Sequence, residues 1–457
     1  MPISASSLPD VLRQITDWKG ERSRLEQEGL KFTFTYFGDA FANPIGGVQQ
    51  GLGYDGRFGT IIDADLGKLV GWSGVTFHAS IHQIHGTQYS ASNLDNLMTV
   101  SGIEAPPSTR LFNLWLAEDI TKQLNLRVGQ FTAAQEFLVS QNANLFVNST
   151  FGWPVINAQD LPSGGPAYPE ATPGARMQYS ANDNVTVLAA IFNGDPAGPG
   201  PGNPVQRDPF GLAFRIQDPP FVIAEVDYSY GQKQATGNGN QEGSMPSPSL
   251  FEDKVSTLPG TLKLGAWVHT GKFADQQFDT QGMLLATSNG TPVQHWGNYA
   301  LYGVLDQTVW TSLDQSADKS SGKGTQTLSL FLRGVVAPAD RNLIDLYADG
   351  GLTLKGPVAS RPDDTIGLGL AYGHISSYAA ANDLEIDAIA GLQFPVRDDE
   401  AVIEFTYQWV LRDGWYIQPD LQYIIHPGGN IANPAIPGTT SPIPNAFVIG
   451  TRFVAHF

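Results

Sequence analysis

Six arginines of this 457-residue chain lie where strand-like alternation places polar side chains, and they are the residues best suited to bind a solute. They are Arg57, Arg127, Arg176, Arg215, Arg333 and Arg452. A guanidinium group offers five donors in a rigid fork, which suits a pair of hydroxyls or a carboxylate. The alternative for each arginine is an ion pair with a carboxylate that stabilises the fold and contacts no solute.

Acceptors and flat apolar rings come from the segment 133–172. Carboxylates there could accept hydrogen bonds from hydroxyls, and they are Glu136, Asp160 and Glu170. Aromatic side chains there could stack on the apolar face of a pyranose, and they are Phe151, Trp153 and Tyr168. His78, His82 and Glu404 add polar groups on the polar sides of their own segments. Together these residues predict a binding surface for a polyhydroxylated solute.

Metal and catalytic chemistry are not indicated. His78 and His82 are four positions apart, which on a strand is about 13 Å, too far to share an ion bound at about 2 Å per ligand. The segment 51–56 fits G-x-G-x-x-G, but a strand rather than a helix is expected after it, so it is not a dinucleotide-binding fingerprint. The chain contains no cysteine and no recognised nucleophile motif. We therefore expect no cofactor and no enzymatic activity.

The elements that carry these residues alternate with a period of two. Residues 403–409 are apolar at odd and polar at even positions, and residues 73–82, 124–129 and 328–333 repeat the pattern. Such segments are half-buried strands. They run for about 10 to 13 residues, close to what crosses a bilayer with tilt, and aromatic residues lie near their ends, as in membrane barrels. The predicted fold class is all-β, a transmembrane antiparallel β-barrel.

The composition agrees with this prediction and excludes other classes. Only 15% of the residues are charged, and the net charge is −18. Strand faces in lipid exclude charge, which accounts for the low fraction, and the acidic balance excludes a nucleic-acid binder. A soluble carbohydrate-binding β-protein would need polar outer faces, contrary to Phe405 and Trp409.

The alternation leaves a strand count of 16 or 18. Alternation marks 17 candidates: 31–42, 54–66, 72–84, 109–120, 123–132, 173–181, 183–192, 208–217, 219–230, 260–271, 295–311, 325–337, 343–355, 364–375, 399–411, 414–426 and 445–457. Bacterial single-chain barrels have even numbers of strands. Short turns and long loops alternate regularly up to residue 230 and again from residue 343. Because 17 is odd, one strand is miscounted, and we expect the miscounted strand between 231 and 342.

Residues 1–30 form a separate segment before the barrel, which occupies 31–457. Apolar residues between Leu8 and Leu25 recur near helical spacing, which predicts a short amphipathic helix over 8–29 on the periplasmic side. The first residues lack the basic-then-apolar layout of a signal peptide, so an exported protein would have lost its leader.

Several short blocks occur in a fixed order along the chain: Asp17-Trp18-Lys19-Gly20-Glu21-Arg22, Leu126-Arg127-Val128-Gly129-Gln130-Phe131, Phe151-Gly152-Trp153-Pro154, Phe192-Asn193-Gly194-Asp195-Pro196, Arg361-Pro362-Asp363-Asp364 and Gln418-Pro419-Asp420-Leu421-Gln422-Tyr423. These blocks resemble the OprB-like family of carbohydrate-selective porins. In this order they span some 400 residues of the chain. The resemblance implies a 16-stranded barrel in the outer membrane of a Gram-negative bacterium that passes mono- or small oligosaccharides by facilitated diffusion.

Within such a barrel, segment 133–172 follows the fifth strand and is predicted to constrict the channel; the alternative is a loop that caps the mouth or contacts a neighbouring subunit. The expected partners are carbohydrate solutes, outer-membrane lipid and, through the terminal Phe457, the barrel-assembly machinery. An outer-membrane barrel hydrolase of lipid or sugar, or a general porin for small solutes, is the alternative function. Which sugar passes and whether the barrel is monomeric or trimeric stay open.

Overall fold

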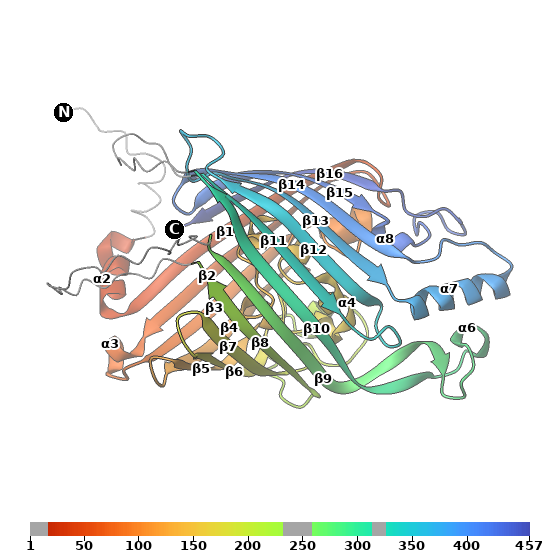
Figure 1. The fold of residues 1–457 in the computed structure, drawn as a ribbon, viewed down its shortest axis with the longest axis horizontal. Helices are drawn as coiled ribbons and strands as arrows, with labels where there is room; N and C mark the ends of the chain where they lie inside the picture. Colours follow the sequence, from red (N-terminus) through yellow and green to blue (C-terminus); the bar gives the residue numbers. More distant parts are fainter. Residues whose placement is uncertain (1–16, 232–257, 313–325) are drawn as a thin grey trace, which may run out of the picture.

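Sixteen antiparallel strands form a closed barrel in the computed structural model, which describes residues 17–231, 258–312 and 326–457 (Figure 1). Each strand pairs with its neighbours in the chain, and the last pairs with the first. The strands are β1 (Leu30–Ile45), β2 (Leu52–Asp65), β3 (Val75–Gly86), β4 (Ser108–Asp119), β5 (Leu124–Phe131), β6 (Thr172–Ser180), β7 (Val185–Asn193), β8 (Pro220–Tyr230), β9 (Gly260–Asp279), β10 (Pro292–Thr311), β11 (Thr327–Val336), β12 (Ile344–Lys355), β13 (Thr365–Ile375), β14 (Asp399–Arg412), β15 (Trp415–Ile425) and β16 (Ala446–His456).

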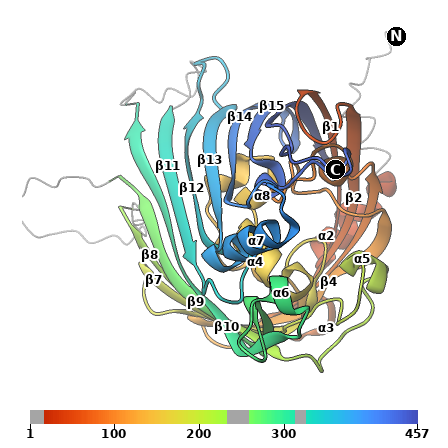
Figure 2. The same ribbon diagram turned by 90° about the vertical axis from the view of Figure 1, so that its right-hand side faces the viewer.

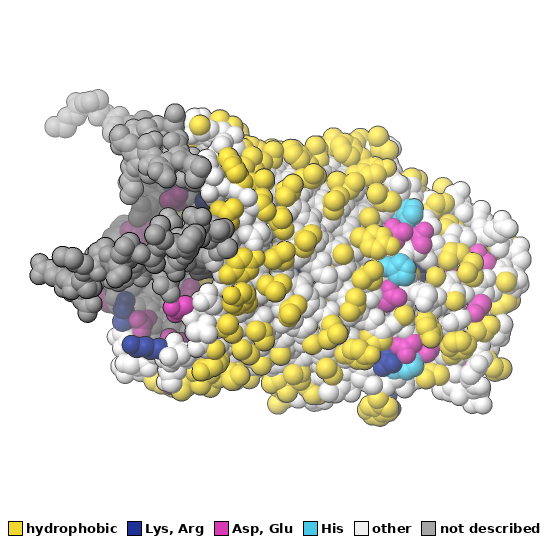
Figure 3. All heavy atoms as spheres, viewed as in Figure 1, with side chains coloured by type: hydrophobic (Ala, Val, Ile, Leu, Met, Phe, Trp, Pro, Cys, Tyr) yellow, Lys and Arg dark blue, Asp and Glu magenta, His cyan; other side chains and the backbone are white. Residues whose placement is uncertain are grey.

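The predicted all-β barrel of 16 strands is thus confirmed. Alternation along β14 shows how the sequence builds its wall: Phe405 is 43% exposed on the outer face, while Glu404 and Thr406 are fully buried on the inner face. On the face drawn in Figure 3, outward apolar side chains form a band across the middle of the molecule, with charged side chains toward its ends. A band of this kind faces the hydrocarbon core of a bilayer.

Helices occupy the connections between strands. They are α2 (Glu21–Glu28), α3 (Leu66–Val70), α4 (Val155–Asp160), α5 (Pro204–Arg207), α6 (Leu285–Ser288), α7 (Ser377–Ala390) and α8 (Pro427–Asn430), with short helical turns at Trp18–Gly20, Ser90–Leu94, Ala133–Gln135, Ala143–Leu145, Ser149–Phe151 and Pro162–Gly164. α6, α7 and α8 lie at the end of the barrel opposite α2 and the C-terminus (Figure 1), and α4 lies inside the ring of strands (Figure 2). The end with α2, the start of β1 and the end of β16 is the end that carries the termini of the barrel. None of the helices in the described ranges has the length and apolar character that crossing a bilayer requires.

Of the 17 predicted strands, 208–217 is the one that does not form. The prediction that the miscounted strand lies between 231 and 342 is therefore wrong. Residues 194–219 form one connection between β7 and β8 that contains α5. Leu212, Phe214 and Ile216 are 58%, 42% and 82% exposed, but Ala213 and Gln217 between and beside them are exposed as well, so the alternation of residue types is not an alternation of exposure. It contributes no strand because β7 already pairs with β8, from Asn193 opposite Pro220 onward.

The regular rhythm of short and long connections fails for the same reason. Counting 208–217 as a strand made Asp218-Pro219 a tight turn and reversed the expected direction of every strand that follows. The connections from β8 to β9 and from β10 to β11 are long, although they lie at the end that carries the termini. Most of their residues, 232–257 and 313–325, lie outside the described residues.

The predicted N-terminal helix is present over Glu21–Glu28, while 1–16 lie outside the described residues. Ring packing of Trp18 on Phe32, with centroids 5.3 Å apart, fixes the segment against β1. The Arg22 guanidinium donates a 2.6 Å hydrogen bond to the carbonyl of Phe32. No residue of α2 is buried, so it attaches to the barrel through its flanks and through Arg22.

Candidate functional site

Two loops fold into the barrel and fill part of its interior. The first connects β3 to β4 (residues 87–107), and the second connects β5 to β6 (residues 132–171). Both are rich in side chains without solvent exposure, including Leu94 and Val100 in the first and Phe137, Leu138 and Ile156 in the second. A barrel of this size would otherwise enclose a wide aqueous lumen, so the space left beside these loops is what a solute could use.

Carboxylates of the wall hold the loop 132–171 by its backbone. Glu404 on β14 accepts hydrogen bonds from the backbone N–H groups of Val147 (2.6 Å) and Asn148 (3.0 Å). Asp306 on β10 accepts from those of Gln141 (3.1 Å) and Asn142 (3.2 Å). Hydrogen bonds to charged acceptors are stronger than neutral ones, so these acids fix the path of the loop.

Arg333 fastens the same loop from β11. Its guanidinium donates to the backbone carbonyls of Leu138 (3.2 Å) and Thr150 (3.1 Å) and pairs with Asp349, and neither charged side chain is exposed. All its terminal nitrogens are therefore engaged. Arg333 and Glu404 were both predicted to line the pore; the structure places them inside the barrel but behind the loop.

Two cavities lie between the loops and the wall formed by β1 to β4. The near chamber, toward the end that carries the termini, has a volume of about 560 Å³, and its lining includes His78, Trp115 and His456. The far chamber, of about 460 Å³, is lined mainly by the two inserted loops, including Glu104 and Trp153. Both chambers share five lining residues, namely Phe37, Arg57, Gly102, Ala134 and Tyr168. These five residues, the junction, are the place where the two chambers meet.

Arg57 occupies the junction between two aromatic rings. Its guanidinium carbon lies 4.5 Å from the ring centroid of Phe37 and 5.4 Å from that of Tyr168. Tyr168 in turn donates a 2.7 Å hydrogen bond from its hydroxyl to the carbonyl of Ile103, which ties the loop 132–171 to the loop 87–107. Within the described residues, the guanidinium group of Arg57 has neither a hydrogen bond nor an ion pair, and its Nε is buried.

Other arginines of the lumen are paired with carboxylates. Arg452 forms a two-pronged pair with Asp39, with distances of 2.9 and 2.7 Å. Glu136 accepts from Arg127 and, at 2.9 Å, from Nε of Arg176. Arg110, which the strand analysis did not single out, pairs with Glu170, and both side chains are almost completely buried.

Residues 49–457 match the family model described as "Carbohydrate-selective porin, OprB family". The chain belongs to this family. It is an outer-membrane carbohydrate porin, because a closed 16-stranded barrel with a lipid-facing apolar band accompanies a match over nearly the whole chain. The resemblance seen in the sequence blocks is therefore confirmed.

Individual relatives of this porin are distant in sequence. It is 24% identical to "Porin B" of Pseudomonas aeruginosa over 98% of this chain and 92% of the relative. It is 22% identical to "Putative porin QuiX" of Acinetobacter baylyi over 90% of this chain and 88% of that protein. The high-pH structure of Pseudomonas putida OprB has the same fold, with a TM-score of 0.79 and 23% identity over 96% of this chain and 97% of the other.

Eight of the fifteen candidate residues named from the sequence line the two chambers of the porin. Arg57 and Tyr168 line both, Trp153 and Arg452 line the far chamber, and the near chamber is also lined by His78, His82, Arg127 and Glu136. His78 is held by Asp63 at 2.7 Å and stacks on Trp115, with ring centroids 4.7 Å apart. His82 stacks on Phe112 at 4.5 Å. Contact of any of these residues with a solute stays a prediction.

Asp160 and Arg215 do not lie where the pore prediction needs them. Asp160, at the end of α4, accepts hydrogen bonds from the backbone N–H groups of Leu343 (3.0 Å) and Ile344 (3.2 Å), so it fastens the loop 132–171 to β12. Its pKa is raised well above its ordinary value by burial. Arg215 lies in the connection 194–219 and pairs with Asp218 at 2.7 Å, because the strand on which its lumen position depended does not form.

Sequence reasoning missed the loop 87–107 entirely. It supplies Glu104 to the far chamber, and Glu400 of the wall accepts from its backbone N–H groups at Leu97 (2.8 Å) and Met98 (2.7 Å). A loop that fills a lumen leaves no periodic signal. Its run of apolar residues away from any strand, among them Leu94 and Met98, is the one available indication of burial.

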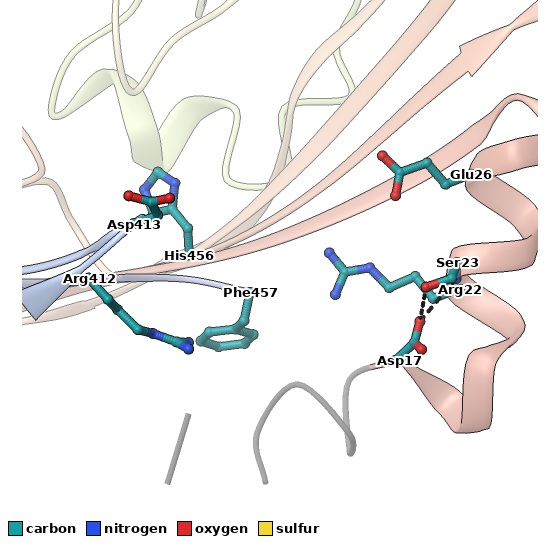
Figure 4. A pocket seen from close by; sticks show the side chains of 8 residues that line it. All are labelled: Asp17, Arg22, Ser23, Glu26, Arg412, Asp413, His456 and Phe457. Carbon is teal, nitrogen blue, oxygen red and sulfur yellow. Dashed lines mark hydrogen bonds between the residues drawn. The ribbon is translucent and has the colours of Figure 1, made fainter. Parts of the chain in front are cut away.

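A third cavity of this porin, of about 590 Å³, lies at the end that carries the termini (Figure 4). The N-terminal segment contributes Asp17, Arg22, Ser23 and Glu26, while Arg412 at the end of β14, the adjacent turn residue Asp413, His456 at the end of β16 and the following Phe457 complete the lining. Asp17 accepts from the backbone and hydroxyl of Ser23, at 3.0 and 2.8 Å. Acidic and basic groups alternate around it, so the lining favours no single charge.

Proposed function

We propose that sugars cross this porin through the near and far chambers and that the junction at Phe37, Arg57 and Tyr168 is the narrow point of their path. The observation that carries the proposal is that the two chambers share these lining residues. In this scheme the segment 133–172 acts as the constriction loop, since Tyr168 lies on it. The wall carboxylates that bind its backbone keep it in the lumen.

The lining of the junction suits a polyhydroxylated solute. Arg57 supplies donors, while Phe37 and Tyr168 supply flat apolar surfaces. Asn113 and Gln135 in the near chamber add amide groups that can donate and accept. A sugar would exchange hydration for several weak contacts, and weak contacts are required because a tightly held solute would not leave.

The termini of the barrel would face the periplasm. The helices α6, α7 and α8 and the inserted loops then belong to the outer side, as do the long loops of outer-membrane barrels. In this orientation a sugar meets the far chamber first and the near chamber last, and α2 stands at the exit.

The alternative of a barrel hydrolase finds less support. Catalysis would need a nucleophile, a base and an orienting group within hydrogen-bond reach of one another. In residues 17–231, 258–312 and 326–457 no serine hydroxyl bonds to a histidine; Ser101 donates to Asp39 (2.5 Å) and Ser163 to Asp195 (2.5 Å). We therefore propose passive diffusion without a chemical step.

Planar-bilayer conductance, combined with swelling of protein-loaded liposomes in isotonic sugar, tests this function. We expect monosaccharides to swell the liposomes and to reduce the ion current in a saturable way. Replacing Tyr168 should alter the sugar block, whereas replacing Glu28, which is exposed on α2, should not. Sugars that neither enter nor block would overturn the proposal.

A further inference from the structure

The near chamber carries a positive charge that the chain as a whole does not. Among its lining residues are Arg57 and Arg127, against the single carboxylate of Glu136. Glu136 is shared with Arg176 behind it. Three guanidinium groups therefore face one carboxylate, which leaves two positive charges in a chain whose net charge is −18.

Neighbouring charged groups do not cancel this excess. Arg452 is neutralised by Asp39 and Arg110 by Glu170, so those pairs contribute no net charge. Asp63 is engaged by His78 and does not line the chamber. A local field opposite in sign to the net charge attracts solutes of one sign into the cavity.

Arg57 is the centre of this excess because it lacks an anionic partner. Buried charges in proteins are normally paired, since an unpaired one costs solvation energy. Phe37 and Tyr168 cover the faces of its guanidinium plane, which compensates only part of that cost. The donors at the edge of the plane remain without a protein acceptor among the described residues. A carboxylate could take two of them in the parallel arrangement that guanidinium groups favour.

Further unpartnered polar atoms surround the same cavity. His82 Nδ1 and Asn113 Oδ1 are buried without a hydrogen-bond partner, as is Nε of Arg127. All three residues line the near chamber with Arg57. Buried polar atoms are rarely left unsatisfied, so water or a polar solute in this cavity would supply the missing partners. These atoms include both hydrogen-bond donors and acceptors, and a hydroxyl group of a sugar can bond to either kind because it donates and accepts.

We propose that the near chamber binds sugars that carry a carboxylate, such as aldonic and uronic acids, with the carboxylate on Arg57 and hydroxyls on the polar groups of Asn113 and His82. This inference rests on the proposed path of sugars through the junction and adds the class of solute that the path favours. Neutral sugars lack the anion that Arg57 requires, so they bind more weakly at this point.

The test compares the block of ion current by D-glucuronate and by D-glucose in planar bilayers at pH 7. For the unaltered porin we expect the half-blocking concentration of glucuronate to be about tenfold below that of glucose, as one charge-assisted hydrogen-bonded pair provides. Arg57→Gln should remove this difference, because the half-blocking concentration of glucuronate rises more than that of glucose and the two values become equal within experimental error. Arg397→Gln is the matched control, because Arg397 pairs with Asp383 at the far end of the barrel and outside both chambers.

Salt provides a second measurement that needs no variant. Raising KCl from 0.1 to 1 M should weaken the glucuronate block several-fold, because screening acts on the ion pair, and should leave the glucose block nearly unchanged. Arg57→Lys, which keeps the charge and loses the fork, should retain part of the preference.

The possible results separate this inference from the function on which it rests. Equal block by both sugars in the unaltered porin, or a preference that survives in Arg57→Gln, overturns the sugar-acid inference while sugar permeation stands. If neither sugar blocks the current or swells liposomes, the proposed function itself fails.

Discussion

Glu404 on β14 accepts a 2.6 Å hydrogen bond from the backbone N–H of Val147, which lies 257 residues earlier in the chain, on the loop inside the barrel. The same carboxylate takes the next N–H, that of Asn148. One wall residue thus satisfies two consecutive backbone donors of a segment that has no sheet partner there. The lumen loop is held by the barrel wall as well as by its own packing.

Glu404→Ala should loosen the loop without opening the barrel. Two buried N–H groups would lose their acceptor, each at about 1–3 kcal/mol. We expect cleavage by added protease within 133–172 and a larger, noisier single-channel conductance. Glu118→Ala is the control, because the side chain of Glu118 on β4 makes no hydrogen bond within the described residues, while its backbone stays paired in the sheet. Unchanged protease resistance and conductance would show that packing alone holds the loop.

Tyr168→Leu should weaken sugar block by roughly two- to tenfold, corresponding to the loss of about 0.5–1.5 kcal/mol of ring contacts. The ring of Tyr168 covers Arg57 and lies 5.8 Å from that of Phe112, so both partners lose a neighbour. Tyr168→Phe keeps the ring and loses only the bond to Ile103, so it should behave nearly as the unaltered porin in titrations of current block. Equal effects of the two substitutions would assign the role to the hydroxyl.

Alternation located all sixteen strands, because the pleat of a wall between lipid and lumen imposes a period of two. It failed at 208–217 because a period of two reports only an extended chain with one apolar side. Pairing decides whether that chain is a strand, and the backbone of Pro220 to Tyr230 pairs with β7 instead. A competition between two segments for one partner is not visible in either segment alone.

Strand phase also placed Arg57 and Arg127 on the lumen side, yet it could not distinguish a free arginine from a paired one. The partner of Arg452 is Asp39, which is 413 residues away and adjacent only because the barrel closes. Glu404 and Arg333 face inward as expected, but an inserted loop covers them. Which inward residues reach the channel depends on loop packing, and loop packing has no period.

Glu104 should make the stability of the porin depend on pH. Burial, together with the nearby Asp55, raises the pKa of its carboxyl to about 7, against an ordinary value of 4.5. Between these values the folded protein binds a proton that the unfolded chain releases, so the stabilisation present below about 4.5 is lost as the pH rises through 7. Glu104→Gln should therefore flatten the decline of the thermal midpoint from pH 5 to 8. Parallel curves for the variant and the unaltered porin would contradict this, and Glu28→Gln serves as control.

Removal of Phe457 should impair assembly, because this residue completes the seam that closes the barrel. Its backbone N–H donates to the carbonyl of Phe34 at 3.0 Å, and its carbonyl accepts from the N–H of Phe34 at 2.9 Å, just beyond the last residue of β16. The ring lies 6.4 Å from that of Trp415. We propose that the barrel-assembly machinery also recognises this end. Loss of the heat-sensitive, fast-migrating form of the porin in outer-membrane fractions would report failed assembly. Phe457→Ala keeps the backbone bonds to Phe34 and removes the ring. If Phe457→Ala assembles normally while the deletion does not, assembly depends on the backbone bonds of the seam, and recognition of the aromatic ring by the assembly machinery is contradicted.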